Sequence, residues 1–237
     1  MTICVIDPRN LIWVMPAEGD VTNTTAAVIL TGGDPVPEAL GRDLPPAAFV
    51  IAADSGLHHA RVLGLEADLV VGDLDSADAA AVAAVRAAGA EIELHPIDKD
   101  ATDLELALDA ALARHLTPVT VVGGAGWDRI DHLLGNAMVL ADPRYRPLDL
   151  TWLVKSARIR VIHDRAALCG QAGDTVSLLA VGGPAAGVAT TGLRWRLESD
   201  DLAPGSTRGI SNEMTSTEAV ISLEQGTLLA IHVGSVT

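Results

Sequence analysis

Short apolar runs alternate with alanine- and leucine-rich segments between residues 26 and 156. The short runs are rich in β-branched residues, as strands are, whereas apolar residues in the longer segments recur at the spacing of a helix. Strands that alternate with helices form a mainly parallel sheet with helices packed on it. We therefore predict an α/β fold, with strands at 26–30, 50–53, 69–71, 91–95, 119–122 and 152–154 and helices at 57–63, 77–88, 102–115 and 129–140.

Two sequence signals mark helix ends within this region. Glu105 follows Thr102 by three residues, which is the pattern of a capping box, so a helix is predicted to begin at Thr102. Gly89 follows the second predicted helix and suits the left-handed conformation that often ends a helix. Both signals agree with the boundaries that the apolar pattern gives.

The pattern changes after residue 158, where helical spacing disappears and turns rich in Gly, Pro, Ser and Asp separate short alternating segments. This change predicts a β-sandwich, and we divide the chain into an α/β domain at 1–156 and a β domain at 157–237. An additional hairpin is predicted within residues 1–25, and 141–150 is predicted to be a loop. The predicted strands outside the α/β sheet are 3–6, 11–15, 158–163, 175–181, 193–197, 219–223 and 228–233.

The composition is that of a soluble globular protein, because 49% of the 237 residues are hydrophobic and 20% are charged. No apolar run is long enough to span a membrane, and residues 1–10 do not resemble a basic leader, so we predict a cytoplasmic protein. Cys4 and Cys169 lack the spacing of metal ligands and are predicted to be packing residues in a reducing compartment, with no disulfide.

The formal net charge of −15 makes nucleic acid and anionic membranes unsuitable partners. Such a chain can hold a polyphosphate only through a local basic site or a bound cation, which points towards Mg²⁺. Excess acid also serves solubility alone, so the charge by itself does not establish a ligand.

Aspartates gather where three predicted strands end. Ligands of open parallel sheets bind beyond the carboxyl ends of the strands, so these side chains are expected to converge. Their mutual repulsion would be relieved by a hard divalent ion such as Mg²⁺. Taken singly, each aspartate could instead be a turn or helix-capping residue. The candidate set is Asp54, Asp73, Asp75, Asp98, Asp100 and Asp103.

Neither standard phosphate-binding loop is present, although a glycine-rich turn at 123–126 lies between a predicted strand and a predicted helix. Backbone N–H groups at such a turn can face an anion, and Arg129 would add a guanidinium. Lys99 is the other candidate cation. Surface ion pairing is an equally simple role for both. Asp131, His132 and Asn136 follow Arg129 on the same predicted helix, where a lone histidine is more often a packing residue than a catalyst.

In the predicted β domain, 190–195 and 210–213 are polar segments beside strands. If 193–197 is a strand, alternation places Leu193, Trp195 and Leu197 on one face and Arg194 and Arg196 on the other. Trp195 would then fill the sandwich core. Alternatively, it could offer an aromatic face to a flat cationic heterocycle.

Six motifs in this order and spacing resemble the thiamine pyrophosphokinase family. The resemblance covers roughly residue 26 to the C-terminus, and Ser55 departs from it because the family usually has glycine there. The motifs are Ala53-Asp54-Ser55-Gly56, Gly72-Asp73-Leu74-Asp75-Ser76, Asp98-Lys99-Asp100 with Thr102-Asp103, Gly123-Gly124 leading to Arg129-Ile130-Asp131-His132, Thr191-Gly192-Leu193-Arg194-Trp195, and Ser211-Asn212-Glu213.

The resemblance implies a nucleotide- and Mg²⁺-binding α/β domain, a thiamine-binding β-sandwich, and a homodimer with thiamine at the subunit interface. It implies Mg²⁺ ligands at Asp54, Asp73, Asp75, Asp100 and Asp103. Residues that it places beside ATP or thiamine are Asp54, Lys99, Thr102, Gly124, Arg129, Asp131, Trp195, Ser211 and Asn212.

The implied reaction moves a diphosphate from ATP to the thiamine hydroxyl and releases AMP. Catalysis would depend on positioning and on charge neutralisation by Mg²⁺ and Arg129, with Asp73 or Asp103 accepting the hydroxyl proton. One alternative keeps the fold but changes the acceptor to another heterocyclic alcohol, such as a hydroxymethylpterin. A second alternative is an inactive regulator that only binds nucleotide or thiamine.

Overall fold

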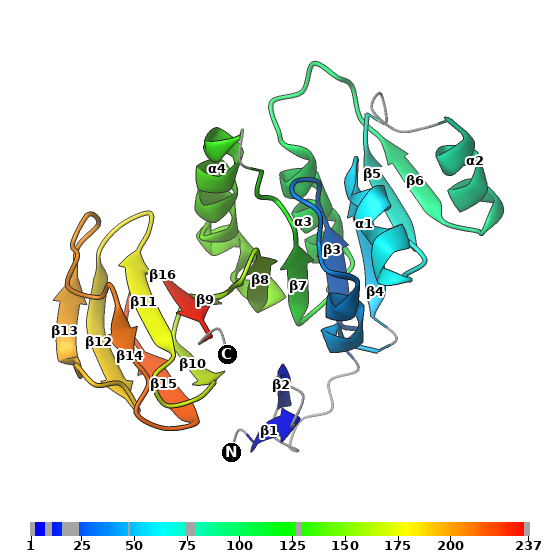
Figure 1. The fold of residues 1–237 in the computed structure, drawn as a ribbon. Coiled ribbons are helices and arrows are strands. Elements are labelled where there is room, and N and C mark those ends of the chain that lie inside the picture. The colour runs from blue at the N-terminus through cyan, green and yellow to red at the C-terminus, as the bar shows by residue number, and fades with distance from the viewer. Residues whose placement is uncertain are drawn as a thin grey trace. The chain divides into compact units, whose positions relative to one another are not determined.

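The computed structural model describes residues 3–7, 11–15, 24–46, 48–73, 79–126 and 129–234. The chain divides into two compact units (Figure 1). The α/β unit comprises Asn23–Val139 and Pro147–Lys155. The β unit comprises Met1–Thr22, Leu140–Arg146 and Ser156–Thr237.

The α/β unit contains a parallel sheet with the strand order β8-β7-β3-β4-β5-β6. The strands at Ala27–Leu30 and Leu69–Gly72 are buried throughout, as their apolar runs predict. The predicted strands and helices of this unit agree with the observed ones to within two residues. The strands are β3 (Ala27–Leu30), β4 (Phe49–Ala53), β5 (Leu69–Gly72), β6 (Glu91–Leu94), β7 (Val119–Val122) and β8 (Leu150–Val154), and the helices are α1 (Gly56–Leu63), α2 (Ala79–Ala87), α3 (Asp103–Ala113) and α4 (Ile130–Leu140).

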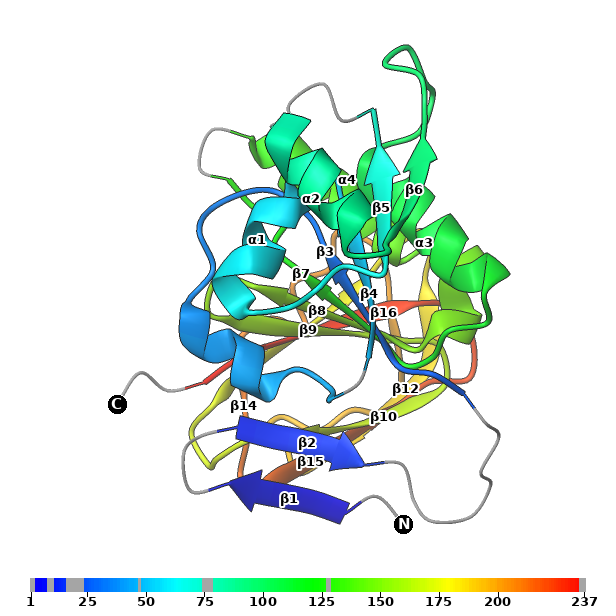
Figure 2. The same ribbon diagram turned by 90° about the vertical axis from the view of Figure 1, so that its right-hand side faces the viewer.

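Helices cover both faces of this sheet (Figures 1 and 2). On one face, Val28 and Val50 pack in one cluster with Ala60 and Leu63 of α1. On the other face, α3 contacts β3, β4 and β5 through its buried side. Because successive side chains of a strand point to opposite faces, each central strand supplies both layers of the core.

Helix α3 begins as the capping box predicts, since Thr102 Oγ1 accepts a hydrogen bond of 3.2 Å from the Glu105 N–H. Gly89 has φ of 96°, which confirms the left-handed residue predicted after α2. A 3₁₀ helix, η1 (Glu38–Asp43), lies between β3 and β4, and a second, η2 (Pro143–Leu148), occupies the segment predicted as a loop.

Apart from its N-terminal hairpin, the β unit has strands that pair antiparallel in the orders β14-β11-β16-β9 and β10-β15-β12-β13. A buried cluster that includes Leu178, Val188 and Ile221 forms its core. The antiparallel β domain confirms the predicted fold class. Its strands are β9 (Ala157–Ile162), β10 (Arg165–Cys169), β11 (Thr175–Ala180), β12 (Ala185–Thr191), β13 (Glu198–Leu202), β14 (Asn212–Glu213), β15 (Glu218–Ser222) and β16 (Leu228–Val233).

The strand predicted at 193–197 is wrong. Leu193 makes only an isolated bridge to Met214, and the strand in this region is β13, which begins at Glu198. Gly192, with φ of 73°, turns the chain directly before Leu193. Because residues 193–197 do not form a regular strand, their side chains do not follow strand alternation.

The predicted N-terminal hairpin is present, with β1 (Ile3–Asp7) antiparallel to β2 (Leu11–Met15). Cys169 at the end of β10 is disulfide-bonded, so the prediction of an unpaired packing residue is wrong for Cys169. The only other cysteine, Cys4, is distant in sequence and lies in β1, whose side chains are outside the description.

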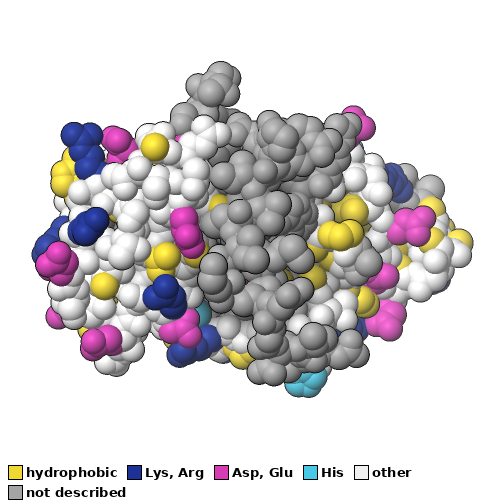
Figure 3. Space-filling view, turned by 90° about the horizontal axis from the view of Figure 1, so that it is seen from below, with side chains coloured by type: hydrophobic (Ala, Val, Ile, Leu, Met, Phe, Trp, Pro, Cys, Tyr) yellow, Lys and Arg dark blue, Asp and Glu magenta, His cyan; other side chains and the backbone are white. Residues whose placement is uncertain are grey.

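Charged side chains of both signs are scattered over the described surface that is seen from below, with no large patch of one sign on this face (Figure 3). Within the described ranges, no helix is long and apolar enough to cross a membrane.

Candidate functional site

A pocket of about 410 Å³ lies beyond the carboxyl ends of the parallel strands, where ligands of such sheets bind. Segments that follow β3, β4, β5 and β7 contribute to its wall, together with the start of α3 and one side of α4. The pocket brings together Asp54, Asp73, Lys99, Thr102, Asp103, Gly124 and Arg129 from the predicted site residues.

Lys99 is held between two of the pocket carboxylates. Its Nζ lies 3.2 Å from Asp73 Oδ2 and 2.8 Å from Asp103 Oδ1. Burial lowers the pKa of Lys99, but hydrogen bonds to Asp103 and Asp73 outweigh that effect and leave the pKa raised. Lys99 therefore stays protonated at neutral pH and offsets part of the acidic charge.

Asp54 lies close to the same group. A side chain at Gly72 would bring its Cβ within 3.2 Å of Asp54 Cβ and 3.3 Å of Asp103 Oδ1, so the two aspartates flank Gly72. Asp54 has φ of 45°, a conformation that few residues other than glycine adopt and that is concentrated at functional sites. Close packing at the ends of β4 and β5 thus places Asp54 and Asp103 near each other.

Two glycine-rich turns, 31–34 after β3 and 123–126 after β7, form another wall of the pocket. The Gly124 N–H donates to Gly32 O over 2.7 Å, and the Asp34 N–H donates to Ala125 O over 2.6 Å. Only the second turn was singled out from the sequence. The signal for the first was a similar pair of glycines, one residue after an apolar strand. Ser55 packs against this turn, because its Oγ occupies the space of a Gly32 side chain.

Arg129 reaches the pocket from the segment before α4, and it is paired on the surface. Its Nη2 lies 3.0 Å from Asp131 Oδ2 and also contacts His132 Nε2. The bond from Arg129 lowers the pKa of Asp131 to about 2. His132 lines the pocket, whereas Asp131 is an exposed partner of Arg129.

The predicted metal ligands are only partly described. Asp75 lies outside the described residues, and Asp100 is exposed and is not part of the pocket wall. Asp54, Asp73 and Asp103 supply carboxylate oxygens of the kind that Mg²⁺ prefers. Across the described ranges, no group of three or more acidic, histidine or cysteine residues is arranged to hold a metal ion.

Trp195, Ser211 and Asn212 lie together in the β unit. The Trp195 N–H donates to Asn212 Oδ1 over 3.1 Å, and Asn212 Nδ2 donates to Trp195 O over 2.7 Å. The Trp195 side chain is 56% exposed, so its prediction as a core residue is wrong. Buried Asn212 fixes the backbone that carries the exposed indole, and the Arg194 guanidinium lies 5.0 Å from the ring centroid.

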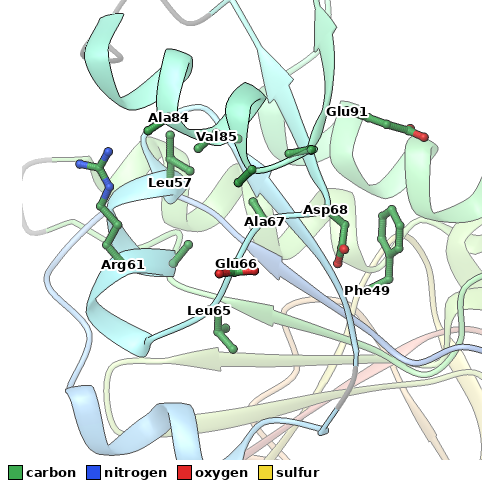
Figure 4. A pocket seen from close by; sticks show the side chains of 14 residues that line it. Phe49, Leu57, Arg61, Leu65, Glu66, Ala67, Asp68, Ala84, Val85 and Glu91 are labelled. Atoms are coloured by element: carbon green, nitrogen blue, oxygen red, sulfur yellow. The ribbon is translucent and has the colours of Figure 1, made fainter.

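A second pocket, of about 420 Å³, lies at the opposite end of the parallel sheet (Figure 4). Leu57, Leu65 and Val85 form part of its apolar lining, and Asp68 and Glu91 come directly before β5 and at the start of β6. It contains none of the predicted site residues. The strand-end pocket, which contains several of them, is therefore the candidate functional site.

Comparison with known protein families identifies the family to which this chain belongs. A model of the thiamin pyrophosphokinase catalytic domain matches residues 43–152, and a model of the thiamin pyrophosphokinase vitamin B1 binding domain matches residues 158–228. The chain belongs to the thiamine pyrophosphokinase family. It is therefore an ATP-dependent diphosphotransferase, as the resemblance of its motifs predicted.

Individual members of the thiamine pyrophosphokinase family agree with this assignment. The thiamine pyrophosphokinase of Bacillus subtilis (strain 168) is 26% identical over 163 residues, which are 68% of this chain and 76% of the relative. A crystal structure of thiamine pyrophosphokinase from B. subtilis has a TM-score of 0.77 at 23% identity and covers 90% of this chain and 100% of that one. Thiamin pyrophosphokinase from Candida albicans has a TM-score of 0.70 at 13% identity, with 98% and 99% covered. The structural likeness supports the fold.

Proposed function

We propose that the strand-end pocket of the α/β unit holds the polyphosphate of ATP and carries out diphosphate transfer to thiamine. The observation that carries the proposal is the convergence of Asp54, Asp73, Lys99 and Asp103 on one pocket with two glycine turns. The residue assignments for ATP are Asp54, Lys99, Thr102, Gly124, Arg129 and Asp131.

In this proposal Mg²⁺ would be held by Asp54, Asp73 and Asp103, with Asp75 and Asp100 as the remaining predicted ligands. Their oxygen atoms suit this ion, which usually completes its coordination with water and substrate phosphates. When bound, Mg²⁺ would neutralise charge on the diphosphate that is transferred. Lys99 and Arg129 would contribute positive charge from the protein itself.

The thiamine hydroxyl oxygen would attack the β-phosphorus of ATP while the bond from this phosphorus to the oxygen of AMP breaks. The protein would hold the attacking and leaving oxygens in line, and Arg129 would stabilise the charge that develops. Either Asp73 or Asp103 would accept the proton of the hydroxyl group. Both side chains belong to the pocket wall that contains Lys99.

Thiamine would stack on Trp195 of the β unit. An exposed indole whose backbone is held by Asn212 suits a flat cationic ring. Ser211, which has φ of 58° and is exposed, stays a proposed thiamine contact. The functional domains would thus be 1–156 for nucleotide and Mg²⁺ and 157–237 for thiamine.

AMP release tests the choice of acceptor. With ATP and Mg²⁺ present, we expect thiamine to support turnover and a hydroxymethylpterin to support little. The pterin alternative would be preferred if it turned over faster. Tight thiamine binding without AMP release would indicate an inactive regulator.

A homodimer with thiamine at the subunit interface is the assembly we propose. Ile130, Leu134 and Met138 are spaced by four residues on α4 and are 63%, 58% and 65% exposed. Such a stripe is typical of a protein–protein contact.

Cytoplasmic localisation stays a prediction, and the disulfide at Cys169 is the observation that weighs against a reducing compartment.

Leu134→Glu is expected to shift the protein from dimer to monomer, because it places a charge in the middle of the apolar stripe. Light scattering coupled to gel filtration would measure the mass. Leu94→Glu is the matched control, since Leu94 is 65% exposed on β6 outside the stripe. An unchanged dimer for both variants would remove α4 from the interface.

Mixing two defective variants tests whether each site is shared between subunits. If Asp73 and Trp195 of one site come from different chains, randomly mixed Asp73→Asn and Trp195→Ala subunits would regain about a quarter of wild-type activity, because half of the dimers have one intact site. The assay uses thiamine well below the KM of the Trp195→Ala protein. No recovery after confirmed subunit exchange would place both residues in the same chain's site.

A further inference from the structure

Three buried side chains hold carbonyl groups of the two glycine turns. His59 Nδ1 lies 2.9 Å from Thr31 O, Trp152 Nε1 donates to Gly123 O over 2.8 Å, and Asn136 Nδ2 donates to Gly124 O over 2.9 Å. The three residues come from α1, β8 and α4 and are between 1% and 6% exposed. Bonds from three separate elements thus converge on turns that line the pocket.

Gly123 and Gly124 allow the donor side chains to come this close to the two turns. A Cβ at Gly123 would lie 2.4 Å from Thr31 O and 3.1 Å from His59 Nδ1, and one at Gly124 would lie 2.8 Å from Asn136 Nδ2. Both glycines also have positive φ, of 92° and 79°. A side chain at either position would displace the donors and strain the backbone.

Burial favours a neutral imidazole at His59. It lowers the pKa of His59, and the bond to Thr31 O only partly opposes this effect. The neutral ring must carry its proton on Nδ1 to donate to Thr31 O. His59 therefore acts as a fixed donor beneath the first turn.

Carbonyl groups that accept hydrogen bonds determine where the N–H groups that follow them point. His59 acts directly at Thr31 O, whereas Trp152 acts through Gly123 O on the Gly124 N–H, which donates to Gly32 O. In a planar trans peptide the C=O and the following N–H point in opposite directions. Thr31 O faces His59, Gly32 O accepts from Gly124, and Ala125 O accepts from Asp34, so the N–H groups of Gly32, Gly33 and Gly126 point away from these partners. All three glycines line the pocket, and successive N–H groups of this kind form anion sites.

We propose that His59, Asn136 and Trp152 are positioning residues for the phosphate site: they lock the two glycine turns so that the N–H groups of Gly32, Gly33 and Gly126 bind a nucleotide polyphosphate. This inference rests on the proposed function of the pocket. A turn released from its donors can rotate a carbonyl oxygen towards the pocket, where it repels phosphate.

Trp152→Phe is the decisive variant, because Trp152 does not line the pocket and the change removes the Nε1–H while keeping an aromatic ring. We expect the KM for ATP and the dissociation constant of inorganic tripolyphosphate to rise about tenfold, with the KM for thiamine within about twofold of wild type. Asn136→Leu, which adds no charge to the pocket, should act in the same direction.

Leu108→Ala is the matched control for stability. Leu108 is as buried as Trp152 and packs in α3, but it donates no hydrogen bond to the turns. It should lower Tm without changing tripolyphosphate binding at a temperature well below Tm. If Trp152→Phe still releases AMP and its KM for ATP and its affinity for tripolyphosphate are unchanged, the inference about the donors is overturned. The proposed function of the pocket would still stand. If wild-type protein released no AMP with thiamine, the proposed function would fail instead. If Trp152→Phe did not fold, tripolyphosphate binding by Asn136→Leu would decide.

Discussion

Asp73→Asn is expected to reduce kcat by about 10³-fold while the protein stays folded. Asp73 follows β5 at the strand-end pocket, and its carboxylate lies 3.2 Å from Lys99 Nζ. The amide has nearly the same shape but lacks the negative charge needed to ligate Mg²⁺ or to accept a proton. Lys99 keeps its contact with Asp103 at 2.8 Å, so the cost in stability should be about 1 kcal/mol.

Steady-state AMP release at several Mg²⁺ concentrations measures this effect, and thermal unfolding checks the fold. If Asp73 binds the metal, excess Mg²⁺ should restore part of the rate; if it is the proton acceptor alone, it should not. Asp98→Asn is the matched control, because it removes the same charge from an exposed position outside the pocket wall. A near-normal rate for Asp73→Asn would contradict both roles.

The α-helices and parallel strands of the α/β unit could be predicted because they have strong local signals, whereas the 3₁₀ helix η1 was not predicted. Buried parallel strands such as β3 are continuous apolar runs, and α3 begins at a recognisable cap. The β unit was harder to predict. Its edge strand β13 has the sequence Glu198–Leu202, which is mostly acidic, so it lacks the apolar alternation by which strands are recognised.

The site was predictable where residue type alone indicates chemistry. Aspartates after strands were found from the sequence, and Asp54, Asp73 and Asp103 do line one pocket. The donors His59 and Trp152 were not identified, because a histidine within a helix and a tryptophan within an apolar strand are ordinary packing residues in a sequence. Their role depends on which carbonyl lies opposite, and only the folded chain determines that.

Trp195 shows how a local departure from regular structure changes a functional prediction. Leu193 and Leu197 are buried as expected, yet Trp195 between them is turned outward because this segment bends after Gly192. An exposed tryptophan held by two bonds to a buried asparagine contributes little to the core. The proposed stacking on thiamine uses this exposed ring.

Trp195→Ala is therefore expected to raise the KM for thiamine by about 10- to 100-fold, which corresponds to the loss of stacking between an aromatic ring and a cationic heterocycle. The KM for ATP should change little. Because the indole is 56% exposed, Tm should stay close to the wild-type value. Initial rates over a range of thiamine concentrations at saturating ATP give the KM, and unfolding monitored by circular dichroism gives Tm.

Two further substitutions separate stacking from a general surface effect. Trp195→Phe keeps an aromatic face and should recover much of the thiamine affinity, whereas Ile210→Ala, which removes another exposed apolar side chain of the β unit, should leave KM unchanged. A large fall in Tm for Trp195→Ala with an unaltered KM would mean that the indole supports the fold. The thiamine site would then have to lie on a different surface of the β unit.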